Sequence, residues 1–104
     1  MLRVQPPKNH GISDQAAITD PLAVPILFHP EKQRILRILI REERTLQELS
    51  TELGMNPGVV KRHLVSLVKF NLVTPTREML NEYGIKLKYY RAVAKLYVVS
   101  LKWP

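Results

Sequence analysis

Apolar residues recur at helical spacing in two adjacent segments, residues 45–53 and 57–70. In the first segment, Leu46, Leu49 and Leu53 fall on one face of a helix. In the second, a stripe at positions i, i+4, i+7 and i+8 is formed by Val60, Leu64, Leu67 and Val68. The pattern predicts two amphipathic helices that follow each other closely along the chain.

The ends of these two helices carry sequence signals of their own. Thr45 and Glu48 form a capping box, because the hydroxyl can accept from the N–H three residues on while the carboxylate accepts from the N–H of the threonine. Gly54 suits the left-handed residue that ends the first helix, and Asn56 followed by Pro57 suits the start of the second. Two short helices joined by a glycine-containing turn form a helix-turn-helix.

Two further helical patterns precede this motif. Pro30 begins the stronger one, which continues to residue 43 with arginines on its outer face and an inner face of Ile35, Leu36, Ile38 and Leu39. Before it, Asp20 and Pro21 open a short apolar helix that runs to Phe28 and that Pro25 shortens or kinks. The apolar surplus of this short helix fits either a dimer contact or burial in the domain's own core.

The first 19 residues show no sustained periodicity and include Pro6, Pro7 and Gly11. We expect residues 1–19 to form an N-terminal arm with little structure of its own, which could still order against a partner subunit. The folded domain is then expected to span residues 20–104.

A short β-hairpin is expected after the helix-turn-helix. Asn71 suits a helix C-terminal cap, and residues 72–74 favour a strand that Pro75 closes. Residues 76–85 are expected to form a loop and residues 86–94 a second strand, while the tail beyond could continue as strand or turn into a short helix. A strand, a loop and a strand after a helix-turn-helix make a wing. The sequence thus predicts an α+β fold that is mainly α with a small β-wing, a winged helix-turn-helix.

The chain of 104 residues is long enough for one compact domain. It has no cysteine, which excludes disulfides and thiolate metal or redox sites and fits a reducing compartment. No apolar run approaches the length of about 20 residues that a membrane span needs. We therefore expect a soluble, cytoplasmic protein with no membrane partner.

The net charge of +7 is confined to the second half of the sequence. Residues 1–56 hold seven Lys or Arg and seven Asp or Glu, whereas residues 57–104 hold nine Lys or Arg and two Glu. Positive charge gathered on the second helix of the motif and on the wing favours a polyanion as partner. The alternative is that these residues only make the surface soluble.

A helix of this kind can enter the major groove of duplex DNA, where base edges are distinguishable. On the helix, a small residue allows close approach, Val59 could contact a thymine methyl group and Arg62 could pair with guanine, while lysines meet phosphates. On the wing, basic side chains near the turn could reach phosphates or the minor groove. The candidate DNA-binding residues are Asn56, Gly58, Val59, Lys61, Arg62, His63, Ser66, Lys69, Arg77, Lys86 and Lys88. The alternative is a solvated helix face without a ligand.

Nothing in the sequence indicates an enzyme, a cofactor or a metal site. There is no glycine-rich phosphate loop, no pair of carboxylates in the basic half and no catalytic Ser/His/Asp set. The three histidines, His10, His29 and His63, show no ligand spacing and are expected to have structural or DNA-contacting roles.

Three segments carry a resemblance to the ArsR-type winged-helix transcription regulators, and to archaeal members in particular. They are HPEKQRILRIL at 29–39, TLQELSTELGMNPGVVKRHLVSLVKFNLV at 45–73 and KYYRAVAK at 88–95. The resemblance implies a homodimer that binds an imperfect palindrome in double-stranded DNA near a promoter and represses transcription by occlusion.

Two departures from the family pattern limit what the resemblance implies. Metal-sensing members carry a cysteine pair on the first helix of the motif, where this chain has LQELSTEL, or ligands on a C-terminal helix that this sequence does not show. Metal sensing is therefore not expected, and a small-molecule effector stays unknown. The alternative function is a winged-helix module that binds protein or RNA without specific DNA recognition.

Overall fold

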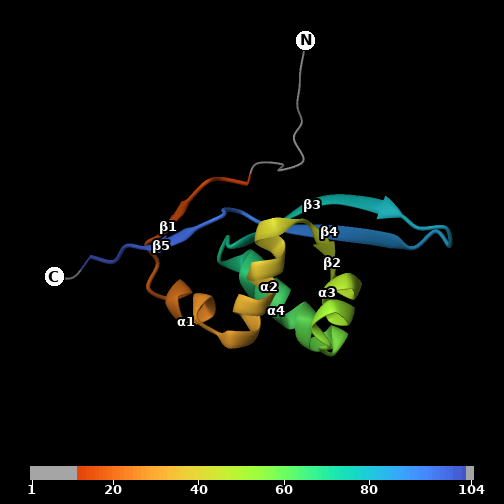
Figure 1. The fold of residues 1–104 in the computed structure, drawn as a ribbon, viewed down its shortest axis with the longest axis horizontal. Helices are drawn as coiled ribbons and strands as arrows, with labels where there is room; N and C mark the ends of the chain where they lie inside the picture. The colour runs from red at the N-terminus through yellow and green to blue at the C-terminus, as the bar shows by residue number, and fades with distance from the viewer. Residues whose placement is uncertain (1–11, 103–104) are drawn as a thin grey trace, which may run out of the picture.

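The computed structural model describes residues 12–102. Four helices lie on one side of this region (Figure 1). They are α1 (Ala23–Leu27), α2 (Pro30–Arg41), α3 (Leu46–Leu53) and α4 (Pro57–Lys69). The helix-turn-helix is the pair α3 and α4, as the sequence predicted.

Five strands in the described part of the chain form two small sheets. The strands are β1 (Ala16–Ile18), β2 (Arg44–Thr45), β3 (Val73–Leu80), β4 (Lys86–Ala92) and β5 (Tyr97–Val99). An antiparallel sheet has the order β2-β4-β3, and β1 pairs with β5 in parallel. The hairpin of β3 and β4 reaches beyond the helices at one end, and β1 and β5 lie at the other end (Figure 1). The fold is a winged helix-turn-helix, which confirms the predicted class.

Local hydrogen bonds define the ends of α3 and α4. The Glu48 N–H donates to Thr45 Oγ1 at 3.1 Å and the Thr45 N–H donates to the Glu48 carboxylate at 2.9 Å, so the capping box is complete. Gly54 has φ +64°, a conformation that side chains disfavour. At the start of α4, the Asn56 side chain accepts from the Gly58 N–H at 2.8 Å. These interactions confirm the boundaries expected from the sequence.

The core lies where α2, α3 and α4 meet the sheet. The four inward positions predicted for α2 are all buried, and so are Val60, Leu64 and Leu67 of the α4 stripe. The largest fully buried side chains are Ile35, Leu39, Leu49, Leu64, Leu67, Leu72, Val60 and Val73. Packing of these side chains fixes α4 against α2, so that one face of α4 remains for solvent or a ligand.

Pro75 does not close the first wing strand, contrary to expectation. Strand β3 continues to Leu80, with a register shift between Pro75 and Arg77. Because β3 is an edge strand in the order β2-β4-β3, a missing N–H at Pro75 can be accommodated there. The wing is therefore longer than the sequence suggested. Asn71 has φ +59° after α4, in agreement with its predicted capping role.

Residues 12–19 differ from the expected unstructured arm. Strand β1 pairs with β5, and the Ser13 N–H donates to the Val93 carbonyl at 2.8 Å. Residues 1–11, the rest of the predicted arm, lie outside the described region. Of the two conformations left open for the tail, strand or short helix, residues Tyr97–Val99 adopt the strand.

Helix α1 is shorter than the segment from Pro21 to Phe28 that the pattern suggested. It has five residues, and the Asp20 carboxylate accepts from the Leu22 N–H at 2.9 Å just before it. Pro25 then lies in the first turn, where an N–H has no intrahelical acceptor, so it is tolerated.

Candidate nucleic-acid interface

The outer face of α4 is the first part of the candidate interface. Its exposed residues recur at i, i+3, i+4, i+7 and i+11, because the opposite face packs into the core. These residues are Gly58, Lys61, Arg62, Val65 and Lys69. Of the residues predicted for DNA contact, Gly58, Lys61, Arg62 and Lys69 therefore share one solvent-facing surface.

The other predicted residues on or before α4 lie at the margin of this surface. Asn56 is exposed, and its side-chain oxygen is engaged by the Gly58 N–H. Val59 and Ser66 are half-buried. A Cβ on Gly58 would lie 3.1 Å from Asn56 Oδ1, so the glycine also allows the cap that starts α4.

His63 lies on the inner face of α4, which corrects its predicted place among the DNA-contacting residues. The side chain is buried, with 8% of the residue exposed. Its Nε2 donates to the Glu31 carboxylate at 2.8 Å, and this hydrogen bond lowers the pKa of Glu31. The ring centroids of His29 and His63 are 5.0 Å apart, although the sequence spacing had not suggested that these histidines meet.

On the wing, the predicted basic residues have different surroundings. Arg77 is held by Glu43, with nitrogen–oxygen distances of 2.7 Å, and its guanidinium lies 4.1 Å from the ring centroid of Tyr89. Lys86 is exposed and lies 3.7 Å from the Glu78 carboxylate. Lys88 is exposed on β4 and forms no ion pair among the described residues. Lys88 is thus the wing cation best placed to meet a phosphate.

A groove with a volume of about 340 Å³ joins α4 to the wing. Lys61 and Lys69 line it from α4 and Lys88 lines it from β4. Its other walls are apolar or aromatic, namely Leu46, Leu64, Val65, Val68, Pro75 and Tyr90. With three cations and no acidic residue among these lining side chains, the groove favours an anionic ligand.

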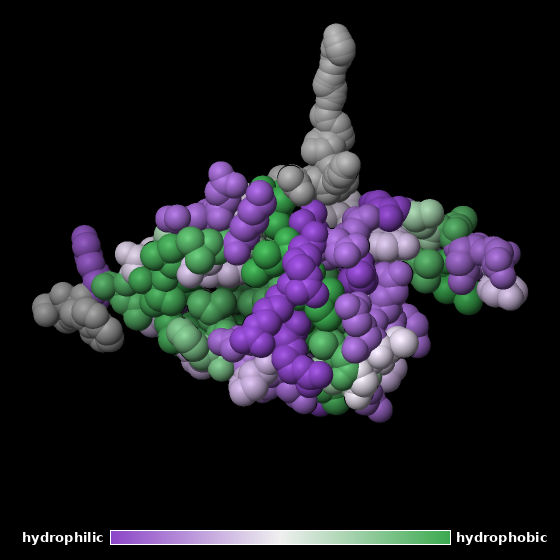
Figure 2. Space-filling model, viewed as in Figure 1, coloured by the Kyte–Doolittle hydropathy of each residue, from purple (hydrophilic) through white to green (hydrophobic). Residues whose placement is uncertain are grey.

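Two exposed apolar features were not among the predicted contact residues. Val65 is 60% exposed between Lys61 and Lys69 on the α4 face. Val65 lies four residues after Lys61, and this spacing predicts that it shares the exposed face. Its apolar character suggested burial instead. At the end of the wing, Leu80, Tyr83 and Ile85 are exposed, and apolar surface is visible there (Figure 2).

The comparisons with known proteins agree with this geometry. Residues 29–74 match the family described as bacterial regulatory protein, arsR family. The matched segment is similar to the ArsR-type winged helix-turn-helix regulators, which confirms the predicted resemblance. These matches support the predicted role of a DNA-binding transcriptional regulator rather than an enzyme.

Three solved structures illustrate the similarity of the chain to known folds. The homodimeric winged helix-turn-helix DNA-binding domain Mb0332 from Mycobacterium bovis is 27% identical, with TM-score 0.59 over 68% of this chain and 60% of that chain. Reduced HlyU from Vibrio cholerae is 21% identical, with TM-score 0.58 over 68% of both chains. The transcriptional repressor BigR from Xylella fastidiosa is 22% identical, with TM-score 0.57 over 68% of this chain and 64% of that chain.

A comparison with curated protein sequences finds no match. Among the described residues, no helix has the length and apolar character needed to cross a membrane.

Proposed function

We propose that the protein is a transcriptional repressor that binds a palindromic operator in duplex DNA as a homodimer. The observation that carries the proposal is the basic surface of α4 and its continuation through the lysine-lined groove to β4. In this arrangement Arg62 and Val65 contact base edges, with Asn56, Gly58, Val59 and Ser66 at the margin. Lys61, Lys69, Lys86 and Lys88 contact phosphates, which position the protein without reading sequence.

His63 is buried and is therefore not among the residues proposed to contact DNA. Arg77 is proposed to contribute only weakly to DNA binding. The ion pair with Glu43 and the stacking on Tyr89 hold Arg77 along the wing. Arg77 would have to leave both partners to reach a phosphate. Its contribution to DNA binding is therefore expected to be smaller than that of Lys88.

An apolar surface at the end opposite the wing supports the dimer. Exposed apolar side chains gather there on and beside α1 and β5, and Figure 2 shows the apolar region on the side away from the wing. They are Leu22, Phe28, Leu96, Val98 and Val99, with exposed fractions from 38 to 70%. A second copy of this chain would cover the surface, and Mb0332 is described as homodimeric.

We expect light scattering at micromolar concentration to give twice the 12.0 kDa mass of one chain. The variant Phe28→Glu should shift the mass toward one chain, because a carboxylate would be buried in the apolar contact. The matched control is Leu80→Glu on the wing, which is similarly exposed (68% against 61%) and should leave the mass unchanged. A wild-type protein that stays monomeric would contradict the proposed dimer.

The variants Arg62→Ala and Lys88→Ala should separate base reading from phosphate contact. Arg62→Ala is expected to weaken operator binding by roughly 1–3 kcal/mol and to relax the preference at one base pair. Lys88→Ala should weaken binding to all duplexes about equally and reduce the salt slope by about one. Fluorescence anisotropy with operator and random duplexes measures both effects. Equal loss on both duplexes for Arg62→Ala would remove it from the reading residues.

Selection of bound sequences from a random duplex pool tests the proposal as a whole. A palindrome with half-sites separated by about 10 base pairs is expected, since two recognition helices of a dimer enter successive major grooves. If no duplex is enriched and single-stranded RNA or a protein partner binds instead, the alternative function replaces this one.

A further inference from the structure

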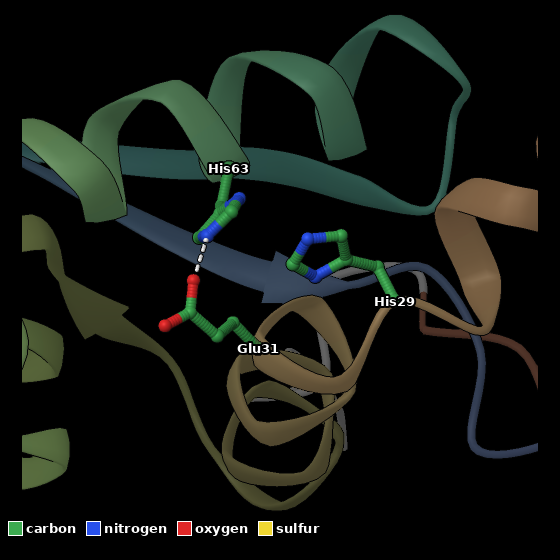
Figure 3. Close-up of side chains that lie close together, drawn as sticks. All are labelled: His29, Glu31 and His63. Atoms are coloured by element: carbon green, nitrogen blue, oxygen red, sulfur yellow. Dashed lines mark hydrogen bonds and ion pairs between the residues drawn. The ribbon is translucent and has the colours of Figure 1, made fainter.

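Two histidines and a glutamate converge between α2 and α4, on the side away from the proposed DNA-contacting face. They are His29, Glu31 and His63, and Figure 3 shows their side chains turned toward one another. One possible ligand atom from each residue lies within 4.8 Å of the others. Two imidazoles and one carboxylate therefore meet in a space small enough for a single ion.

The fold brings these residues together from two elements distant in sequence. His29 directly precedes Pro30 at the start of α2, and Glu31 lies in the first turn of that helix. His63 projects from the buried face of α4. Packing of α4 against α2 in the core thus holds the three donors in place, which reduces the conformational entropy lost when an ion binds.

The hydrogen bonding of this cluster leaves a donor atom without a partner. Glu31 is paired with His63, but Nδ1 of His29 is buried and has no hydrogen-bond partner among the described residues. A buried polar atom without a partner has a cost in free energy, and coordination of a metal ion through Nδ1 of His29 would give this atom a partner.

We propose that His29, Glu31 and His63 form a binding site for a transition-metal dication of the Zn²⁺ type. Imidazole nitrogens with one carboxylate oxygen are the donor set of three-ligand zinc sites, in which a water takes the fourth position. Hard ions such as Mg²⁺ prefer oxygen donors only. The absence of cysteine from the chain means that the site uses nitrogen and oxygen alone.

The present distances are close to those that an ion requires. Metal–ligand bonds of about 2.1 Å in a tetrahedron separate the donor atoms by roughly 3.4 Å. The distance between Glu31 Oε1 and His63 Nε2, now 2.8 Å, would increase slightly on binding. Distances between other ligand atoms, which are within 4.8 Å, would decrease where they exceed the tetrahedral separation. Side-chain rotation can supply such changes without moving the helices. The Glu31 side chain is 45% exposed, so an ion and its water can enter from solvent.

Two electrostatic features near the cluster disfavour cation binding, and one favours it. The positive end of the α2 dipole and the guanidinium of Arg34 lie near the cluster, and both disfavour a cation. Arg34 is directed toward the Leu53 carbonyl, to which it donates at 3.2 Å. The carboxylate of Glu31 supplies the compensating negative charge. A bound ion would link the start of α2 to the middle of α4.

Isothermal titration calorimetry of the full chain with Zn²⁺ tests the site in the absence of DNA, so its outcome does not depend on the proposed function. One ion per chain is expected to bind, and Mg²⁺ should give no heat of binding. The variants His29→Gln and Glu31→Gln should each weaken Zn²⁺ binding by about tenfold or more, since each removes a ligand. The matched control is His10→Gln, which removes the remaining histidine of the sequence and should leave the affinity unchanged.

The role of His63 as a ligand is tested on the wild-type chain, because replacement of this buried residue could disturb the core. In ¹⁵N NMR of the imidazoles, Zn²⁺ should shift the signals of His29 and His63 and leave those of His10 in place. Absence of saturable binding overturns the proposal. So does binding that survives both cluster variants, or that is lost in His10→Gln, because either result means adventitious binding outside the cluster.

Discussion

Affinity for duplex DNA is expected to fall by roughly 10³- to 10⁵-fold when the salt concentration rises from about 50 to about 200 mM. This corresponds to about six to ten neutralised phosphates per dimer. The basic half of the chain holds nine Lys or Arg, of which two arginines are held closely within the fold. Arg77 is paired with Glu43, and Arg91 is buried against carbonyl groups. The remaining cations on α4 and the wing are sufficient for this slope when both subunits contribute.

Charge-reversal variants test which surface binds DNA. Lys61→Glu combined with Lys88→Glu places two carboxylates on opposite walls of the groove and should abolish binding at about 150 mM salt. The control Arg41→Glu with Lys102→Glu changes the net charge equally at exposed residues that do not line the groove, and it should retain most of the affinity. A binding constant nearly independent of salt would mean that the +7 charge serves solubility, and the protein-binding alternative would then be favoured.

Replacement of Arg91 by leucine is expected to lower the free energy of unfolding by about 3 kcal/mol or more. Arg91 is 7% exposed on β4, and its guanidinium donates to the carbonyls of Leu39, Ile40 and Arg41 at 3.0, 3.0 and 3.1 Å. These carbonyls belong to the last turn of α2, where no intrahelical N–H reaches them. Helix α2 ends at an extended Glu42 without a left-handed glycine, so the arginine supplies the missing donors and a favourable charge at the negative end of the dipole.

Thermal and urea unfolding followed by circular dichroism measure this loss. For a domain of this size the melting temperature should drop by roughly 10–20 °C. Arg91→Lys keeps the charge but not the planar set of donors, and it should fall between wild type and Arg91→Leu. The control Lys88→Met changes an exposed residue of the same strand and should stay within about 0.5 kcal/mol of wild type. Arg91→Leu with unchanged stability would show that water replaces the guanidinium at no cost.

The sequence by itself determined the helix-turn-helix, because the signals that define it are local. The capping box of Thr45 and Glu48, the left-handed Gly54 and the Asn56 cap each involve atoms within a few residues of one another. The apolar spacing of α2 and α4 was equally sufficient for the core. A helix has one period, and a run of large aliphatic side chains at that period has only one face to bury.

Tertiary structure alone decided which polar residues lie at the margins of these faces. His63 lies three residues after Val60 and four before Leu67, so its spacing allows burial, while its polarity suggested the outer face. Only the packing of α4 on α2 supplies the carboxylate of Glu31 that makes burial of the imidazole favourable. Arg77 was likewise predicted to reach a phosphate or the minor groove, and the partner that holds it, Glu43, lies 34 residues away in sequence.

The same reason explains the ends of the chain and the wing. Strands β1 and β5 are three residues each, too short for a periodic signal, and they form only because the fold brings residues 16–18 beside residues 97–99. Pro75 lies inside β3 because that strand is at the edge of the sheet, a position that depends on strand order and not on local sequence. Local chemistry therefore specified the DNA-binding motif, and contacts between distant segments specified the surroundings of its side chains.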